Sequence, residues 1–177
     1  MPAKKPNLFL KLLSLFSVVR GYNILVIAIA QYLASVFIIA PSYLPVKKIV
    51  FDVNLFLIVV SSALVIASGY IINNFYDSAK DLINRPRKTY LDNMVSQQTK
   101  LSLYFILNFV SIFIASSISF QSVLFFTAYI FAIWLYSHQL KRNVFVGNLT
   151  ASILAVTPFF AVFIYYKNFD LVIFVHA

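Results

Sequence analysis

Five long apolar runs dominate the chain, and short segments that hold most of its charged residues separate them. A helix needs about 20 apolar residues to cross the hydrocarbon core of a bilayer, and each run reaches or approaches that length. The fourth run is the shortest, and Gln121 between it and the third run predicts a tight helical hairpin. We therefore predict an all-α membrane protein with five complete spans, at residues 18–40, 54–75, 101–120, 122–136 and 149–166.

The two ends of the chain extend this pattern. Residues 7–17 place Lys11 among leucines and phenylalanines, which is typical of an amphipathic helix at the membrane surface; a plain extension of the first span is the alternative. Residues 170–177 begin a sixth apolar run that is too short to cross a bilayer. We therefore expect five spans and the start of a sixth, with residues 1–177 forming the N-terminal part of one longer domain.

Composition places the chain firmly in the membrane class. It is 62% hydrophobic and only 11% charged, which excludes an ordinary soluble domain. The net charge of +9 resides mainly in the short loops, as orientation signals do, so we expect membrane lipid and no nucleic acid as a partner. The absence of cysteine excludes a disulfide framework and a thiolate metal site.

The basic residues of the loops also predict an orientation. Ten of them fall in segments that share one side of the predicted bundle, and three fall on the other. This bias predicts that the first side faces the cytoplasm. The ten are Lys4, Lys5, Lys11, Lys80, Arg85, Arg87, Lys88, Lys100, Lys141 and Arg142, and the three are Lys47, Lys48 and Lys167.

A stripe of polar side chains ends the second apolar run. Asn73, Asp77 and Asp81 are spaced i, i+4 and i+8, so on a helix each lies about 40° from the last and all three share one face. A carboxylate at the centre of a bilayer costs about 2.5–3.5 kcal/mol, which requires a compensating interaction. The alternative explanation is that these residues cap the helix and pair with nearby basic residues, namely Lys80, Arg85 or Arg87.

Hard oxygen ligands and adjacent cations together point to a metal and a phosphate. Magnesium prefers oxygen ligands and commonly bridges one or two carboxylates to a substrate phosphate. Arg85, Arg87 and Lys88, which follow the stripe, would repel a free metal ion but would hold an anionic diphosphate. We predict a magnesium-diphosphate site, although these basic residues could instead anchor the helix end to lipid headgroups.

This segment resembles the first signature of the UbiA-type intramembrane prenyltransferases, Asn-x-x-x-Asp-x-x-x-Asp followed by basic residues and a proline. Here it reads Asn73, Asp77, Asp81, and then Arg85 to Lys88 with Pro86 among them. The similarity extends from Arg20 and Asn23 to the region from Tyr136 to Asn148. It looks nearest to the bacterial branch described as geranylgeranylglycerol-phosphate geranylgeranyltransferase-like.

The resemblance implies a multi-helix bundle that moves a prenyl group from an isoprenoid diphosphate to an acceptor, with Mg²⁺ as cofactor. Asp77, Asp81 and Asn73 would be the catalytic metal ligands. The substrate-binding residues would be Arg20, Asn23, Arg85, Lys88 and Lys141. The acceptor would be a lipid such as geranylgeranylglyceryl phosphate, or an aromatic acid such as 4-hydroxybenzoate or a naphthoate of quinone synthesis.

The bacterial resemblance implies a bacterial inner membrane as the location, and the loop charges predict that the site faces the cytoplasm. The family carries a second aspartate motif after its sixth helix, and residues 1–177 hold no such motif, so we expect this chain alone to be inactive. A secondary transporter and a non-catalytic membrane protein are the competing classes. Basic residues beside the carboxylates count against a cation pathway.

Overall fold

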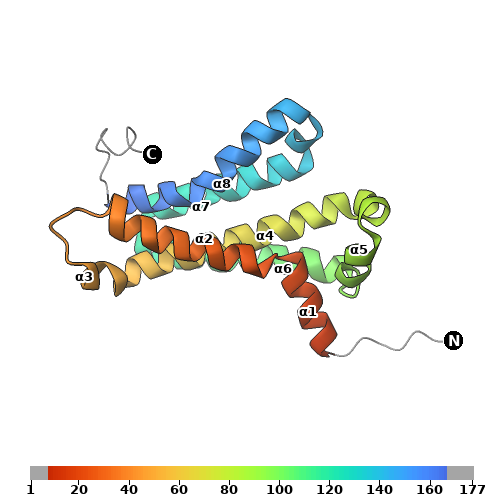
Figure 1. The fold of residues 1–177 in the computed structure, drawn as a ribbon, viewed down its shortest axis with the longest axis horizontal. Helices are drawn as coiled ribbons and strands as arrows, with labels where there is room; N and C mark the ends of the chain where they lie inside the picture. The colour runs from red at the N-terminus through yellow and green to blue at the C-terminus, as the bar shows by residue number, and fades with distance from the viewer. Residues whose placement is uncertain (1–7, 167–177) are drawn as a thin grey trace.

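The computed structural model describes residues 8–166, apart from the side chains of residues 8, 79, 80, 87, 88 and 91, and this part is helical throughout its regular structure (Figure 1). The elements are α1 (Leu8–Val18), α2 (Gly21–Ala34), η1 (Ser35–Ile39), α3 (Val46–Val50), α4 (Val53–Asn84), α5 (Pro86–Asp92), α6 (Gln97–Ile118), α7 (Phe120–His138), η2 (Leu140–Arg142) and α8 (Val144–Tyr166).

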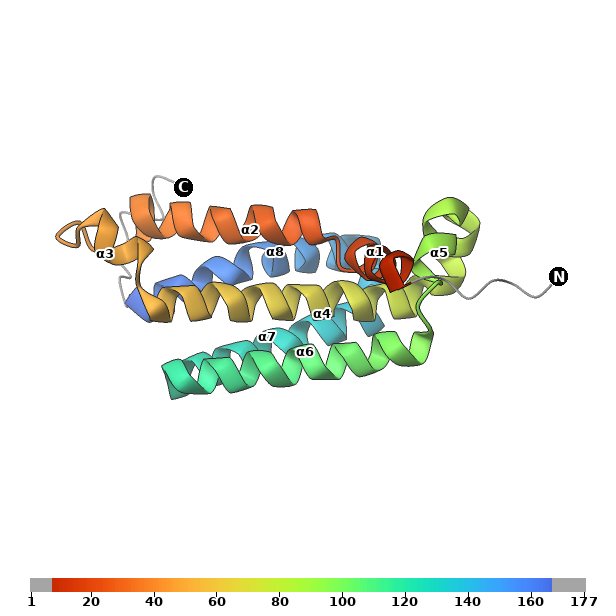
Figure 2. The same ribbon diagram turned by 90° about the horizontal axis from the view of Figure 1, so that it is seen from below.

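Five helices are long and apolar enough to cross a membrane, which confirms the predicted architecture: Gly21–Ile39, Val53–Ser78, Gln97–Ile118, Phe120–Arg142 and Val144–Tyr166. They lie roughly along one direction and form an elongated bundle (Figures 1 and 2). The fifth begins five residues earlier than predicted. The expected start of a sixth run lies outside the described residues.

The hairpin between the third and fourth spans turns at Ser119 and not, as predicted, at Gln121. Ser119 has an extended backbone, with φ −167° and ψ 159°, and its hydroxyl oxygen accepts a hydrogen bond from the Ser122 amide at 3.1 Å. Serine is a favoured residue at a helix start because its side chain binds an otherwise unpaired amide. Gln121 therefore lies within α7, and the fourth span is longer than the apolar run alone suggested.

Helix α4 forms the centre of the bundle, between α2 and α8 on one side and α6 and α7 on the other (Figure 2). Small polar residues join it to α6. Ser111 donates to the Ser61 carbonyl oxygen at 3.1 Å, and the Ser68 hydroxyl lies 2.6 Å from Asn108 Oδ1. Small residues allow helix backbones to approach closely, and their hydroxyl groups bond across the interface.

Helix α1 is separate from the first span, so the interpretation of residues 7–17 as a plain extension is wrong. The chain breaks at Arg20, whose backbone is left-handed with φ 50° and ψ 54°, and α1 then leaves at an angle to α2 (Figure 1). The Phe16 ring packs so closely on Gly21 that a β-carbon there would overlap it. Exposed Phe9 and Leu12 on α1 suit a helix at the membrane surface.

A buried polar cluster fixes α5 to the bundle. The Asp92 carboxylate accepts hydrogen bonds from Ser17 Oγ at 2.9 Å and from Asn74 Nδ2 at 3.1 Å, and Lys100 Nζ donates to Asn74 Oδ1 at 2.9 Å. Asp92 and Lys100 are almost completely buried. Lys100, which the sequence placed among the loop charges, is therefore buried in the bundle. Together these side chains join α1, α4, α5 and α6.

Candidate functional site

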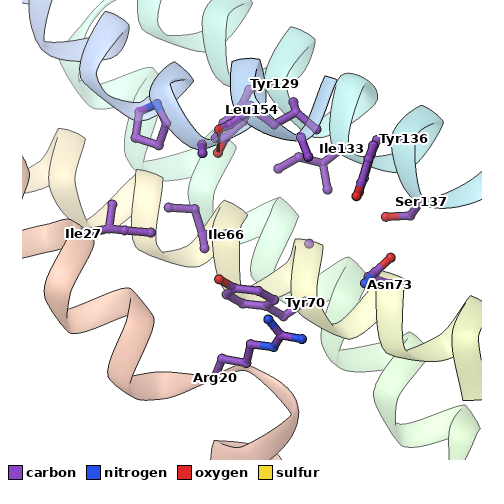
Figure 3. A pocket seen from close by; sticks show the side chains of 14 residues that line it. Arg20, Ile27, Ile66, Tyr70, Asn73, Tyr129, Ile133, Tyr136, Ser137 and Leu154 are labelled. Atoms are coloured by element: carbon purple, nitrogen blue, oxygen red, sulfur yellow. Dashed lines mark hydrogen bonds between the residues drawn. The ribbon is translucent and has the colours of Figure 1, made fainter. Parts of the chain in front are cut away.

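A cavity of about 400 Å³ lies between α2, α4, α7 and α8. Its two ends differ chemically (Figure 3). Polar side chains gather toward one end, and apolar side chains line the rest. The polar group comprises Arg20, Tyr70, Asn73, Tyr136 and Ser137, and the apolar lining includes Ile27, Ile66, Ile133, Leu154 and Pro158. Such a cavity suits a ligand with a polar head and a long apolar tail.

Just outside the lining at the polar end, two oxygen atoms from α4 converge on one cation, and of the residues involved only Asn73 lines the cavity. Lys141 Nζ lies 2.8 Å from Asp77 Oδ1 and also 2.8 Å from Asn73 Oδ1. The short turn η2 carries Lys141 to this point, and Gly147 allows α8 to pack on η2. A β-carbon on Gly147 would lie 3.1 Å from Lys141 Cα. The structure thus brings together Asn73, Asp77 and Lys141, three of the predicted site residues.

Asp81 lies one turn farther along α4, half-buried and outside the cavity lining. Within residues 8–166, no group of three or more acidic, histidine or cysteine side chains is placed to hold a metal ion. The oxygen atoms of Asn73 and Asp77 nevertheless suit one hard cation, because both already bind the same ammonium group. Magnesium would find two protein ligands here, and a role for Asp81 remains a prediction.

Arg20 and Asn23 both lie around Tyr70. The Arg20 guanidinium carbon is 5.2 Å from the centre of the Tyr70 ring, and Asn23 Nδ2 donates to the Tyr70 hydroxyl at 3.3 Å. Arg20 contributes to the cavity lining, and its contact with a substrate stays a prediction. Asn23 is outside the lining. Its hydrogen bond instead orients the Tyr70 ring, and the Arg20 guanidinium group lies against this ring.

The remaining predicted residues, Arg85 and Lys88, are not part of the cavity lining. Arg85 is exposed at the end of α4, and its carbonyl oxygen accepts hydrogen bonds from the amide and the hydroxyl of Thr89, both at 3.0 Å. The Lys88 side chain lies outside the described residues. Their contact with a diphosphate therefore stays a prediction. The helix-capping alternative does not apply to Asn73 or Asp77, because α4 continues to Asn84.

Several lining residues escaped the sequence reasoning. Tyr70 and Ile66 precede Asn73 by three and seven residues, so the polar stripe could have been extended backward along the same face of α4. Ser137 is almost fully buried in the lining, and its hydroxyl has no hydrogen-bond partner within the described part of the chain. No short-range pattern identifies Ser137 as a cavity residue.

Proline shapes the α8 wall of the cavity. Pro158 lies inside α8 and has no amide hydrogen, so the Leu154 carbonyl loses its usual helical donor. The Tyr129 hydroxyl supplies the missing bond to that carbonyl at 3.0 Å. Tyr129, Leu154 and Pro158 all line the cavity, so this exchange of partners fixes α7 against α8 at its wall.

Five apolar spans, four of which surround a cavity with one polar end, define an integral membrane protein. Residues 28–177 match the UbiA prenyltransferase family over most of the chain. The chain belongs to this family, in agreement with the resemblance drawn from its Asn73–Asp81 segment.

Curated relatives carry the name digeranylgeranylglyceryl phosphate synthase. The protein of Thermococcus sibiricus is 33% identical over 93 residues, which is 52% of this chain and 33% of the relative. That of Sulfurisphaera tokodaii is 28% identical over 138 residues, 78% of this chain and 47% of the relative. That of Pyrococcus horikoshii is 26% identical over 144 residues, 81% and 50% respectively. The chain thus spans half or less of these relatives.

A solved structure described as digeranylgeranylglyceryl phosphate synthase in membranes has the same fold. Its TM-score is 0.75 at 18% sequence identity, and the match covers 89% of this chain and 54% of that one. This likeness confirms the helical arrangement of the UbiA type.

Proposed function

We propose that this chain forms part of a membrane enzyme that transfers a prenyl group from an isoprenoid diphosphate to an acceptor. The observation that carries the proposal is the cavity, which joins an apolar body to a polar end that includes Asn73, and beside this end Lys141 binds both Asn73 and Asp77. An isoprenoid diphosphate has the same two parts, an apolar chain and an anionic head. Family membership supports the same reaction class.

In this reaction the bond between the prenyl carbon and the diphosphate oxygen breaks, and its electron pair leaves with the diphosphate. The acceptor forms the new bond to that carbon and releases a proton. The growing negative charge is the main barrier, and positive groups fixed in advance lower it most effectively. Magnesium held by Asn73 and Asp77, with Asp81 as a proposed further ligand, would supply such charge to the leaving group.

The chain's own cations support this role. Lys141 lies beside the polar end, where it binds the lining residue Asn73, and would contact the diphosphate directly, while Arg20 of the lining would offer it paired hydrogen bonds. The Tyr70 ring already lies beside the Arg20 cation, and an aromatic face of this kind also suits a positively charged prenyl carbon. Arg85 and Lys88, on the adjoining segment, are further proposed contacts for the diphosphate.

For the acceptor we favour geranylgeranylglyceryl phosphate, in keeping with membrane lipid synthesis. The support is that the relatives described above are named digeranylgeranylglyceryl phosphate synthases. An aromatic acid remains the alternative. We also propose a bacterial cell membrane as the location, with the polar end of the cavity facing the cytoplasm.

Asp77→Asn tests the proposal in the whole protein, which means these 177 residues and whatever the gene encodes after Ala177. We expect the variant to lose at least about a hundredfold in product from labelled geranylgeranyl diphosphate, because about 2.7 kcal/mol is typical of a lost charge-stabilising contact. Asp81→Asn should follow it. Residues 1–177 alone should give less than about one percent of the whole protein's product.

Asp52→Asn is the matched control. Asp52 caps the start of α4 at the opposite end of the bundle by binding the Asn54 and Leu55 amides, and asparagine caps a helix equally well. Its turnover should therefore stay near that of the wild type. Turnover of Asp77→Asn within about threefold of wild type would refute the assigned role.

A further inference from the structure

A buried polar layer lies one helical turn beyond the apolar lining of the cavity on α2 and α4. The Gln31 side-chain amide donates to Ser62 Oγ at 3.2 Å and to the Pro158 carbonyl oxygen at 2.9 Å. Gln31 and Ser62 are almost completely buried. One side chain of α2 therefore binds both α4 and α8, and it does so across the space between these helices.

This layer lies directly beyond the cavity lining. On α2 the lining residue Ile27 precedes Gln31 by four residues, and on α4 the lining residue Ile66 follows Ser62 by four. Four residues are about one helical turn. Pro158, the third partner, is itself a lining residue. All three helices thus place the end of the cavity at the same depth, with Gln31 behind it.

The depth can be compared with the length of a prenyl chain. Asn73 and Ile66 are seven residues apart on α4, so the lining extends for about 10 Å along this helix. An extended chain advances roughly 1.1–1.2 Å per main-chain bond, as a polypeptide does. A geranyl group of about seven such bonds spans roughly 8 Å, whereas a geranylgeranyl group of about fifteen spans roughly 18 Å.

We infer that Gln31 limits the length of prenyl chain that lies straight in this cavity. The inference rests on the proposed function, with the diphosphate at Asn73 and the chain directed toward Pro158. A longer chain could advance only by displacing the Gln31 amide from both of its partners. That would leave buried polar groups unpaired, which is unfavourable.

The unpaired atom of Gln31 indicates that the side chain is a costly choice for packing alone. Its Oε1 is buried and has no hydrogen-bond partner among the described residues. Methionine has a similar length and would fill the same space without a buried, unpaired oxygen. Two variants can therefore separate filled space from hydrogen bonding. Gln31→Ala removes the side chain from this space, and Gln31→Met fills it again without the hydrogen bonds.

The experiment measures magnesium-dependent binding of geranyl and geranylgeranyl diphosphates to the whole protein in detergent. For the wild type we expect the longer ligand to bind no more than about threefold more tightly, since its extra carbons stay outside the straight cavity. Gln31→Ala should raise that ratio to about tenfold or more, because the chain then buries additional carbons. Gln31→Met should keep the wild-type ratio.

Three results would overturn the inference. In the first, the affinity ratio for Gln31→Ala equals that of the wild type. In the second, the ratio for Gln31→Met shifts as much as that for Gln31→Ala, which would assign the effect to hydrogen bonds and not to filled space. Binding of neither ligand by any form would refute the proposed function itself, and with it this inference. Thermal unfolding of each variant verifies that it is folded.

Ile27→Phe tests the same direction of the chain if Gln31→Ala fails to fold. It leaves the Gln31 bonds intact and fills the last turn of the lining. We expect it to weaken geranyl diphosphate about tenfold while leaving dimethylallyl diphosphate, whose tail is too short to reach Ile27, within about threefold. Unchanged geranyl affinity would show that the chain does not run toward Gln31.

Discussion

Lys141 sits where a metal ion would be expected, 2.8 Å from one oxygen of Asn73 and one of Asp77. A free metal ion must compete with this ammonium group for the same two oxygen atoms. A diphosphate changes that competition, because it attracts both Lys141 and the metal ion. At the residue scale, the proposed function therefore predicts that metal binding and diphosphate binding are coupled through Lys141.

Lys141→Met should separate the two ligands. We expect magnesium alone to bind about tenfold more tightly, because its competitor is gone, and diphosphate to bind about tenfold more weakly, each change being worth about 1.4 kcal/mol. Isothermal titration of each ligand measures both affinities. Lys48→Met, at an exposed lysine on α3, is the control. Changes of the same sign for both ligands would disprove competition at this site.

Helical spacing identified the α4 face, whereas Lys141 was expected only from the family resemblance and its contact with that face was not predicted. The i, i+4 spacing identified Asn73 and Asp77 correctly as neighbours, because helical periodicity is a local property. Lys141 is 64 residues from Asp77, and no spacing rule reports a contact between different helices. Lys100 shows the same limit, since a lysine near a loop looks exposed until its partner Asn74 is known.

At the scale of elements, the break between α1 and α2 combines a strained backbone with a side chain of the cavity lining. A left-handed conformation costs a non-glycine residue about 1–2 kcal/mol, and Arg20 adopts it while contributing to the cavity lining. We interpret this as stability given up for the direction of the guanidinium group.

Arg20→Gly and Arg20→Ala should therefore differ in stability but agree in binding. Both remove the guanidinium group, so both should weaken diphosphate binding by a similar factor of about tenfold. Glycine also relieves the backbone strain, so the free energy of unfolding of the glycine variant should be about 1 kcal/mol higher than that of the alanine variant. Thermal unfolding in detergent measures the difference. Equal stability of the two variants would contradict strain at Arg20.

Helix α8 allows a sharper test of how Pro158 shapes the wall. In the wild type, Tyr129→Phe leaves the Leu154 carbonyl without its donor and should cost about 1 kcal/mol of unfolding free energy. With Pro158→Ala already present, the new amide can bond to Leu154 within the helix, so Tyr129→Phe should cost almost nothing. A double-mutant cycle measures this coupling; additive effects would contradict it.

Most elements could be predicted because long apolar runs have few alternatives in a bilayer. The residues at which the elements begin and end were harder to predict from the sequence. The apolar run indicated a turn at Gln121, but the chain turns at Ser119, where a side-chain cap supplies the bond that a helix start lacks. The separate α1 was likewise ambiguous, because nothing in the local pattern reveals the left-handed backbone at Arg20.

At the scale of the whole molecule, we expect the two ends of the bundle to lie on opposite sides of the membrane. The chain contains no cysteine, so single cysteines can be introduced without background. A cysteine at exposed Arg85 should react with an impermeant reagent only from the cytoplasmic side, and one at exposed Lys48 only from the outer side. Labelling of position 85 from outside alone would reverse the proposed orientation.

The contact between Asp77 and Lys141 also bears on the order of events at the ribosome. Asp77 is synthesised 64 residues before Lys141, a gap of roughly 3–13 s at typical rates of translation. During that interval α4 carries a carboxylate whose partner does not yet exist. The arrival of η2 then supplies the missing charge and gives the hairpin of α7 and α8 an electrostatic reason to dock on α4, which makes this docking a late step in assembly.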